Sequence, residues 1–168
     1  EDYPPTERLL ALVPEARGGE WAVELGACRG MAATALKAKG YLVLGLELFH
    51  QLVREALLGP FYAVADMHAL PCRRSRAKVI FADNVLEHAH NLRHVLGEVA
   101  HVLAPAGRLY GAVPLQARLW SECHLWSAET LDELTLVFQA QAPGLSLISL
   151  ELMEATEPQC LFVLTKTG

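Results

Sequence analysis

Short apolar runs alternate with helical patterns along most of the chain. Seven runs predict strands, and they lie at 21–25, 41–46, 61–65, 78–82, 108–113, 145–153 and 159–165. The first five are almost continuously apolar, which is typical of parallel strands that helices cover on both faces. The loop at 154–158 is short, and a short loop favours an antiparallel arrangement of the last two strands.

Apolar residues at helical spacing fill the segments between the strands. Helices are expected at 7–13, 30–39, 52–57, 92–103 and 128–140. Thr6, Asn91 and Ser127 stand where three of these helices need N-terminal caps, because their side chains can accept a backbone hydrogen bond. This order predicts an α/β fold with one domain over 1–168. We expect a doubly wound, mostly parallel, Rossmann-like seven-stranded sheet with an antiparallel last strand.

Polar groups follow four of the predicted parallel strands, at the point where each strand ends. The loop 26–30 follows the first, and Glu47, Asp66 and Asn84 stand at the ends of the next three. The carboxyl ends of parallel strands meet at one edge of a sheet, so we expect these groups to face a single ligand. The loop 26–30 also leads straight into a helix, whose N-terminus offers unpaired N–H groups and positive partial charge.

The residue types at these strand ends indicate a nucleoside joined to an amino acid. Glu47 can accept hydrogen bonds from two ribose hydroxyls, and Asp66 can accept one from an adenine amine. A dinucleotide pyrophosphate calls for the pattern G-x-G-x-x-G, but Cys28 and Met31 break it, which argues against a nicotinamide-dependent dehydrogenase. The Glu24 carboxylate disfavours phosphate and favours an ammonium group beside the loop. We therefore infer S-adenosylmethionine as the ligand.

The loop 26–30 also belongs to the first of four motifs that match a known family. In that family an acidic residue is followed by glycines at alternate positions. Here the acidic residue is Glu24, and Gly26 and Gly30 are the matching glycines. Cys28 replaces the middle glycine. It keeps a small residue at the turn but adds a Cβ where a ligand approaches the backbone closely.

The other three motifs lie farther along the chain, at 66–71, 84–88 and 102–109. They are an acid followed by Leu-Pro, a polar residue followed by Leu-Glu-His, and a helix end that leads into a strand. Ala106 replaces a usual glycine in the last of them. Together the four motifs make the stretch 21–114 resemble the class I S-adenosylmethionine-dependent methyltransferases of the small type 11 group.

The resemblance implies S-adenosylmethionine as cofactor and gives nine residues a role in holding it. Those expected beside its methionine part are Glu24, Gly26, Ala27 and Gly30. Those expected beside the nucleoside and the methyl group are Glu47, Leu48, Asp66, Met67 and Asn84. Glu24 would lie near the amine and Glu47 would bind the ribose hydroxyls, while Leu48 would flank the adenine. Asp66 and the Met67 amide would read the adenine edge.

The expected reaction is methyl transfer to a small molecule, a lipid or a glycan. Transfer from a sulfonium mostly needs alignment, and it needs a base only where the acceptor loses a proton early. His88 and His124, after the fourth and fifth strands, are the candidate catalytic bases. Each has a plainer interpretation. His88 could hydrogen-bond a backbone carbonyl, and His124 could join Trp120 and Trp126 in a core or lid.

Two departures from the family pattern, Cys28 and Ala106, and a C-terminal third that matches the pattern poorly leave an alternative function open. It is a catalytically weak S-adenosylmethionine-binding scaffold, or a methyltransferase-like protein that depends on a partner. An oligomer is possible, but nothing in the sequence indicates one. A metal site is not expected, because His90 and His94 have helical spacing but no H-E-x-x-H pattern and no converging cysteine.

Composition narrows the setting of the protein. The chain has 168 residues, 52% of them apolar, and a net charge of −5, so it lacks the basic surface of nucleic-acid binders. Its four cysteines form no C-x-x-C pair, which favours a reducing compartment. No apolar run approaches the ~20 residues of a membrane span, and no signal-peptide pattern is seen. We therefore expect a cytoplasmic protein.

Overall fold

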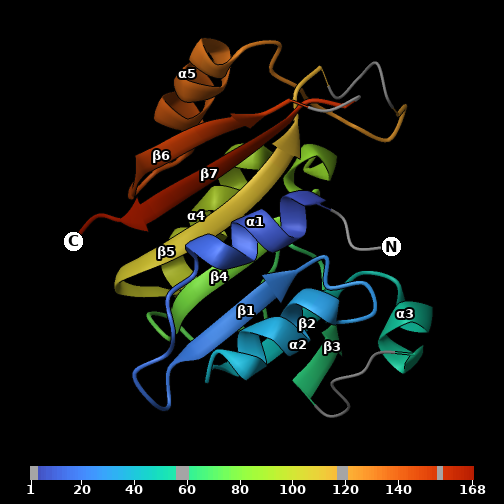
Figure 1. Cartoon of the computed structure of the whole chain (residues 1–168), viewed down its shortest axis with the longest axis vertical. Coiled ribbons are helices and arrows are strands. Elements are labelled where there is room, and N and C mark those ends of the chain that lie inside the picture. The colour runs from blue at the N-terminus through green and yellow to red at the C-terminus, as the bar shows by residue number, and fades with distance from the viewer. Residues whose placement is uncertain (1–3, 56–60, 117–120, 155–156) are drawn as a thin grey trace.

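The computed structural model describes residues 4–55, 61–116, 121–154 and 157–168 (Figure 1). Within these ranges one sheet has seven strands in the order β3-β2-β1-β4-β5-β7-β6. The strands are β1 (Trp21–Leu25), β2 (Leu42–Glu47), β3 (Tyr62–Val64), β4 (Ala77–Asp83), β5 (Leu103–Pro114), β6 (Leu145–Met153) and β7 (Gln159–Lys166). Strands β1 to β5 are parallel, and β7 runs antiparallel to both β5 and β6. The predicted mostly parallel sheet with an antiparallel last strand is confirmed.

Helices cover both faces of this sheet. They are α1 (Pro4–Leu12), α2 (Met31–Ala38), α3 (His50–Glu55), α4 (Leu92–Val102), α5 (Leu131–Gln141) and the 3-10 turn η2 (Leu86–His88). In Figure 1, α1 and α2 lie in front of the sheet and α4 lies behind it. Strand β4 shows the division, because Val79 and Phe81 join the core under α1 and α2, whereas Ile80 and Ala82 join the core under α4 and α5.

Three predicted helix starts can be compared with the structure. Asn91 caps α4, and its side chain accepts a hydrogen bond from the His94 amide at 3.0 Å. The prediction for Ser127 is wrong, because Thr130 caps α5 and accepts from the amide of Glu133 at 3.2 Å. The Thr-x-x-Glu spacing of a capping box is visible in the sequence at this point, and it outweighs the serine.

The prediction for Thr6 is also wrong. Helix α1 begins at Pro4, so Thr6 lies inside the helix and does not cap it. Its hydroxyl donates instead to the carboxylate of Asp83 at the end of β4. The predicted helix over 52–57 begins earlier, as α3 at His50, and its end falls outside the described residues. None of the helices in the described ranges is long and apolar enough to cross a membrane.

The register of the sheet brings the ends of four strands together. Leu25 at the end of β1 pairs with Leu46 of β2 and with Ala82 of β4, while Glu47 pairs with Val64 of β3. The strand order reverses between β1 and β4. This reversal is the topological switch point at which open α/β sheets bind their ligands.

Candidate active site

A cavity of about 440 Å³ opens at the carboxyl ends of these strands. Seven of the predicted site residues line it, and they are Gly26, Glu47, Leu48, Asp66, Met67, Asn84 and His88. Four others, Glu24, Ala27, Gly30 and His124, are not part of its lining. The wall also contains Leu25, Cys28, Leu46, Phe49, Leu52, Ala65, Asp83, Val85 and Cys123, which sequence motifs alone do not single out as a lining.

The loop after β1 is a tight turn in which the amides of Ala27 and Gly30 both donate hydrogen bonds to backbone carbonyls. The Ala27 amide donates to the Leu46 carbonyl at 3.0 Å, and the Gly30 amide donates to the Ala27 carbonyl at 2.7 Å. Gly26 has a φ of +65°, and a Cβ at this position would lie 2.7 Å from a methyl group of Val85. Ala27 and Gly30 therefore shape the turn, while Gly26 forms part of the cavity wall.

Cys28 takes the left-handed conformation that the usual glycine would adopt more easily. Its φ is +44°, and its amide donates to the Glu47 carboxylate at 2.9 Å. Its carbonyl accepts from the Tyr62 hydroxyl. Burial, and then the nearby carboxyl of Glu47, raise the pKa of the Cys28 thiol, so the thiol stays protonated and is a poor nucleophile.

Glu47 is held ready at the wall of the cavity. Only 5% of its surface is exposed, and its second carboxylate oxygen accepts from the Phe49 amide at 3.1 Å. Two backbone amides, those of Cys28 and Phe49, therefore fix the carboxylate from opposite sides. A fixed, buried carboxylate at a strand end is well suited to accept hydrogen bonds from a pair of hydroxyls.

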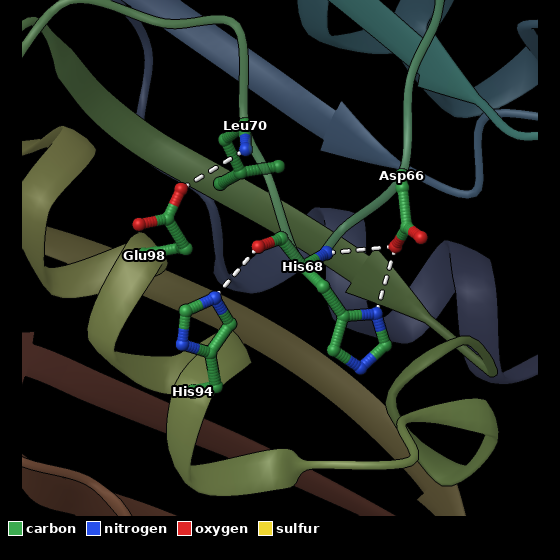
Figure 2. Close-up of polar contacts among 5 residues, drawn as sticks. All are labelled: Asp66, His68, Leu70, His94 and Glu98. Atoms are coloured by element: carbon green, nitrogen blue, oxygen red, sulfur yellow. Dashed lines mark hydrogen bonds and ion pairs between the residues drawn. The ribbon is translucent and has the colours of Figure 1, made fainter.

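The loop that carries Asp66 is anchored to α4, as Figure 2 shows. The His68 amide and ring Nδ1 both approach one oxygen of Asp66, at 2.8 and 2.7 Å. These hydrogen bonds lower the pKa of the Asp66 carboxyl. From α4, the ring Nε2 of His94 lies 2.8 Å from the His68 carbonyl, and Glu98 accepts from the Leu70 amide at 3.0 Å. Sequence patterns miss His94 and Glu98, because no local signal links a helix to this distant loop.

Glu24 lies beneath the turn, where it is 6% exposed. Within the described residues, its Oε2 is buried without a hydrogen-bond partner. Burial, followed by the nearby carboxyls of Asp83 and Glu47, raises its pKa to about 8, although the Ala33 amide opposes the shift. Without a ligand, Glu24 is therefore mostly a neutral acid at pH 7.

The polar end of the cavity is formed by the residues that follow β4. Asn84 has a φ of +49°, and its side-chain amide donates to the Asp83 carboxylate at 2.8 Å. Burial raises the pKa of Asp83, against the effect of its hydrogen bonds with Thr6 and Asn84. Asn84 is thus fixed in the bend between β4 and η2, facing the cavity.

His88 reaches the cavity, whereas His124 packs behind it. The ring Nδ1 of His88 lies 3.1 Å from the Cys123 carbonyl, which is the backbone contact of its plainer interpretation. The ring centroids of His88 and His124 are 5.0 Å apart. Trp126 donates through its indole N–H to the Leu86 carbonyl at 2.7 Å and anchors this segment, while Trp120 lies outside the described residues.

A comparison with known families identifies the class of protein. A family model described as a methyltransferase domain matches residues 23–111, which is more than half of the chain. The chain therefore belongs to this family of S-adenosylmethionine-dependent methyltransferases, and S-adenosylmethionine is its cofactor. The family and the cofactor predicted from the sequence are confirmed. No curated protein sequence matches the chain.

Solved structures show the same fold at low sequence identity. One match is a chain from the complex of the Haloferax volcanii Trm112 methyltransferase activator with a candidate methyltransferase, at 20% identity and a TM-score of 0.82, covering 96% of this chain and 88% of that one. A geranyl diphosphate methyltransferase in complex with S-adenosylmethionine matches at 13% identity and 0.81, covering 98% and 85%. The [4+2]-cyclase SpnF matches at 13% and 0.80, covering 97% and 80%.

Proposed function

We propose that this methyltransferase binds S-adenosylmethionine in the cavity and transfers its methyl group to a small-molecule, lipid or glycan acceptor. The observation that carries the proposal is the buried Glu47 carboxylate, fixed by two backbone amides beside Asp66 in one largely apolar cavity. Glu47 is then placed to bind the ribose and Asp66 to bind the adenine amine of one nucleoside.

The adenine is proposed to lie against the apolar part of the wall. Leu48 and Phe49, which line the cavity, are 58% and 65% exposed. A planar base would cover them and remove their apolar surface from water. Asp66 and the Met67 amide would then meet the polar edge of the base. The proposed roles of Leu48, Asp66 and Met67 are therefore those expected from the sequence, namely to flank the adenine and to bind its edge.

The methionine part is proposed to extend from Gly26 toward Asp83. Gly26 lines the cavity without a side chain of its own, so the ligand can approach its backbone closely. The ammonium group of the ligand would be attracted by Glu24 beneath the turn and by Asp83 in the cavity wall. Ala27 and Gly30 support this end indirectly, because they close the turn.

Methyl transfer is proposed to occur beside Asn84 and His88. The sulfonium is already activated, so the main task is to hold the acceptor atom about 3–3.5 Å from the methyl carbon and in line with the breaking C–S bond. His88, at the cavity wall, is the proposed base where the acceptor carries a proton. His124 is not part of the cavity lining, and its ring lies beside that of His88, so its proposed role is to support that ring.

Calorimetry with S-adenosylmethionine and S-adenosylhomocysteine tests this function. We expect binding by the wild-type chain and at least a tenfold loss in Glu47→Gln, because each charge-assisted hydrogen bond contributes about 1.5–3 kcal/mol. Glu7→Gln, on the exposed side of α1, is the matched control and should bind as the wild type does. A wild-type chain that binds neither compound would contradict the proposal.

One observation favours partner-dependent activity as a second candidate. The Haloferax volcanii match is a chain from a complex with a methyltransferase activator. In the present chain, β3 is an edge strand of three residues, and Phe61 and Val64 beside or within it are 50% and 53% exposed. Full activity of the purified chain alone, unchanged by extract from its source cells, would rule this candidate out.

The setting proposed for the protein is the cytoplasm. All four cysteines are free thiols, and two of them, Cys28 and Cys123, are exposed. Exposed free thiols are typical of a reducing compartment. We also propose that 1–168 acts as one domain without nucleic acid as a partner.

A further inference from the structure

Three potential metal ligands converge at the polar end of the cavity. Among the described residues, one nitrogen each from His88 and His124 and the Sγ of Cys123 all lie within 4.8 Å of one another. His88 belongs to η2, whereas the other two lie in the segment after β5, 35 residues farther along the chain. This convergence is a property of the fold, since no local motif brings the three together.

Hydrogen bonds hold the two segments in register. The Leu125 amide donates to the Glu87 carbonyl at 2.8 Å, and the Trp126 indole donates to the Leu86 carbonyl at 2.7 Å. With the contact between His88 and the Cys123 carbonyl, they tie both ends of η2 to the segment 121–126. A cluster that is fixed on both sides loses little conformational freedom when an ion binds.

We propose that His88, Cys123 and His124 form a Zn²⁺ site whose fourth position opens into the cofactor cavity. Zinc binds imidazole nitrogen and thiolate sulfur, and in catalytic zinc sites three protein ligands leave a fourth position for water or substrate. Magnesium and calcium prefer oxygen donors, so they do not fit these residues. His88 and Cys123 both line the cavity, which directs the open position toward the cofactor.

The distances are compatible with zinc after a small adjustment. Tetrahedral Zn²⁺ with bonds of about 2.0–2.3 Å places its ligand atoms about 3.3–3.6 Å apart. Separations of up to 4.8 Å therefore need to close by up to about 1.2–1.5 Å, and rotation of the exposed Cys123 side chain supplies part of this.

The surroundings of the cluster also suit a metal. In zinc sites, a coordinating histidine usually donates its other ring N–H to a carbonyl or carboxylate. The Nδ1 of His88 has such a partner in the Cys123 carbonyl, so in the proposed site Nε2 binds the ion. The Ser121 hydroxyl lies 2.8 Å from the Cys123 Sγ, and it can donate to the thiolate that forms when zinc displaces the thiol proton.

Bound zinc would serve an acceptor that carries a hydroxyl or a thiol. Coordination lowers the pKa of such a group, so it releases its proton to solvent. Its lone pair then forms a bond to the methyl carbon while the C–S bond of the sulfonium breaks, and the electron pair stays on the sulfur of S-adenosylhomocysteine. This step rests on the proposed function. In the zinc-loaded protein His88 and His124 act as ligands, and the metal replaces the base.

Titration of the metal-free protein with Co²⁺ tests the site without relying on activity. We expect one equivalent to bind with a thiolate-to-cobalt charge-transfer band, and Zn²⁺ to displace it. Cys123→Ser should abolish the band, and His88→Gln or His124→Gln should weaken Zn²⁺ binding by more than about tenfold. Cys28→Ser is the matched control, because its thiol lines the same cavity, and it should keep the band.

Two results would overturn the site: a folded wild-type chain that binds neither Co²⁺ nor Zn²⁺, or a band that survives in Cys123→Ser and disappears in Cys28→Ser. Absence of metal binding by the folded wild-type chain refutes the site even if a variant fails to fold. S-adenosylmethionine binding is measured on the same samples. Cofactor binding without metal binding would refute the zinc site alone, and metal binding without cofactor binding would refute the proposed function alone.

Discussion

The acidic side chains around the cavity differ in charge state because their surroundings differ. Hydrogen bonds from His68 hold the pKa of Asp66 below its usual value, so this carboxylate is charged at neutral pH. Burial raises the pKa of Glu24 to about 8, so this carboxyl is mostly neutral until a cation approaches. Two residues of similar chemistry thus prepare the site for different parts of one ligand.

Glu24 is expected to release a proton when the cofactor binds at pH 7. A carboxyl with a pKa near 8 is about nine-tenths protonated at that pH, and an adjacent ammonium group lowers its pKa by favouring the ionised form. Calorimetry in two buffers of different ionisation enthalpy should give different binding enthalpies. Glu24→Gln should remove most of that difference, and Glu7→Gln should retain it. Equal enthalpies in the wild type would contradict this role.

Gly26 and Cys28 should respond in opposite ways to substitution. Gly26→Val is expected to abolish cofactor binding, because its Cβ would meet Val85 and its backbone is left-handed. Cys28→Gly relieves a left-handed strain of about 1–2 kcal/mol, so binding should be kept or tightened. Calorimetry measures both, with circular dichroism as the folding control. Unchanged binding in Gly26→Val would mean that the loop is not the cofactor site.

At the scale of elements, α4 controls the loop that carries Asp66. Asn91 caps the start of the helix, and Val95 and Val99 pack one face of it against the core. His94 and Glu98 are four residues apart, so they lie on the same face of α4. They contact the His68 carbonyl and the Leu70 amide of the loop. Figure 2 shows both side chains reaching from α4 to this loop.

His68→Ala is expected to weaken S-adenosylmethionine binding by about tenfold or less, since it removes one charge-assisted hydrogen bond from Asp66 and leaves the backbone one. Because Asp66 is proposed to hold the adenine, away from the methyl group that is transferred, kcat at saturating cofactor should change little. His101→Ala, an exposed position on α4, is the control. A fall in kcat with an unchanged cofactor KM would assign His68 a different role.

At the scale of the whole molecule, the strand order gathers several carboxyl groups at one buried edge. Glu24 and Glu87 are both nearly inaccessible, and burial raises their pKa values to about 8 and about 7. In each, one oxygen lacks a hydrogen-bond partner among the described residues. The unliganded protein therefore carries groups whose ionisation opposes folding, which is a common cost of a binding site.

The unliganded protein is expected to lose stability as the pH rises from about 5 to 8. Below the ordinary carboxyl pKa of 4.5, Glu24 and Glu87 are protonated in both the folded and the unfolded chain. Above it they ionise first in the unfolded chain, and this ionisation lowers the free energy of the unfolded state relative to the folded one. Glu24→Gln should flatten this dependence and raise the melting temperature at pH 8 by a few degrees, about 2–4 °C per kcal/mol. Thermal melts across this range measure it. A wild-type melting temperature that rises from pH 5 to 8 would contradict the raised pKa values of Glu24 and Glu87.

Much of the element pattern follows from local sequence. Apolar runs place β1, β2, β4 and β7 within about one residue at most ends, because burial on both faces demands continuous hydrophobicity. The residues that cap helices are harder to predict from the sequence, as α1 and α5 show. Thr6 and Ser127 have the right chemistry for a cap, but packing and the Thr130–Glu133 pair decide where these helices begin.

The sequence by itself determined the α/β class, the strand ends that carry Glu47 and Asp66, and the family with its cofactor. These features are local, since strand periodicity and motif spacing act over a few residues. Only the tertiary structure decided which distant side chains meet, as Cys123 meets His88 and His94 meets the loop after β3. It also decided the pKa of Glu24, because burial depends on how α2 packs over β1 and not on the identity of the residue.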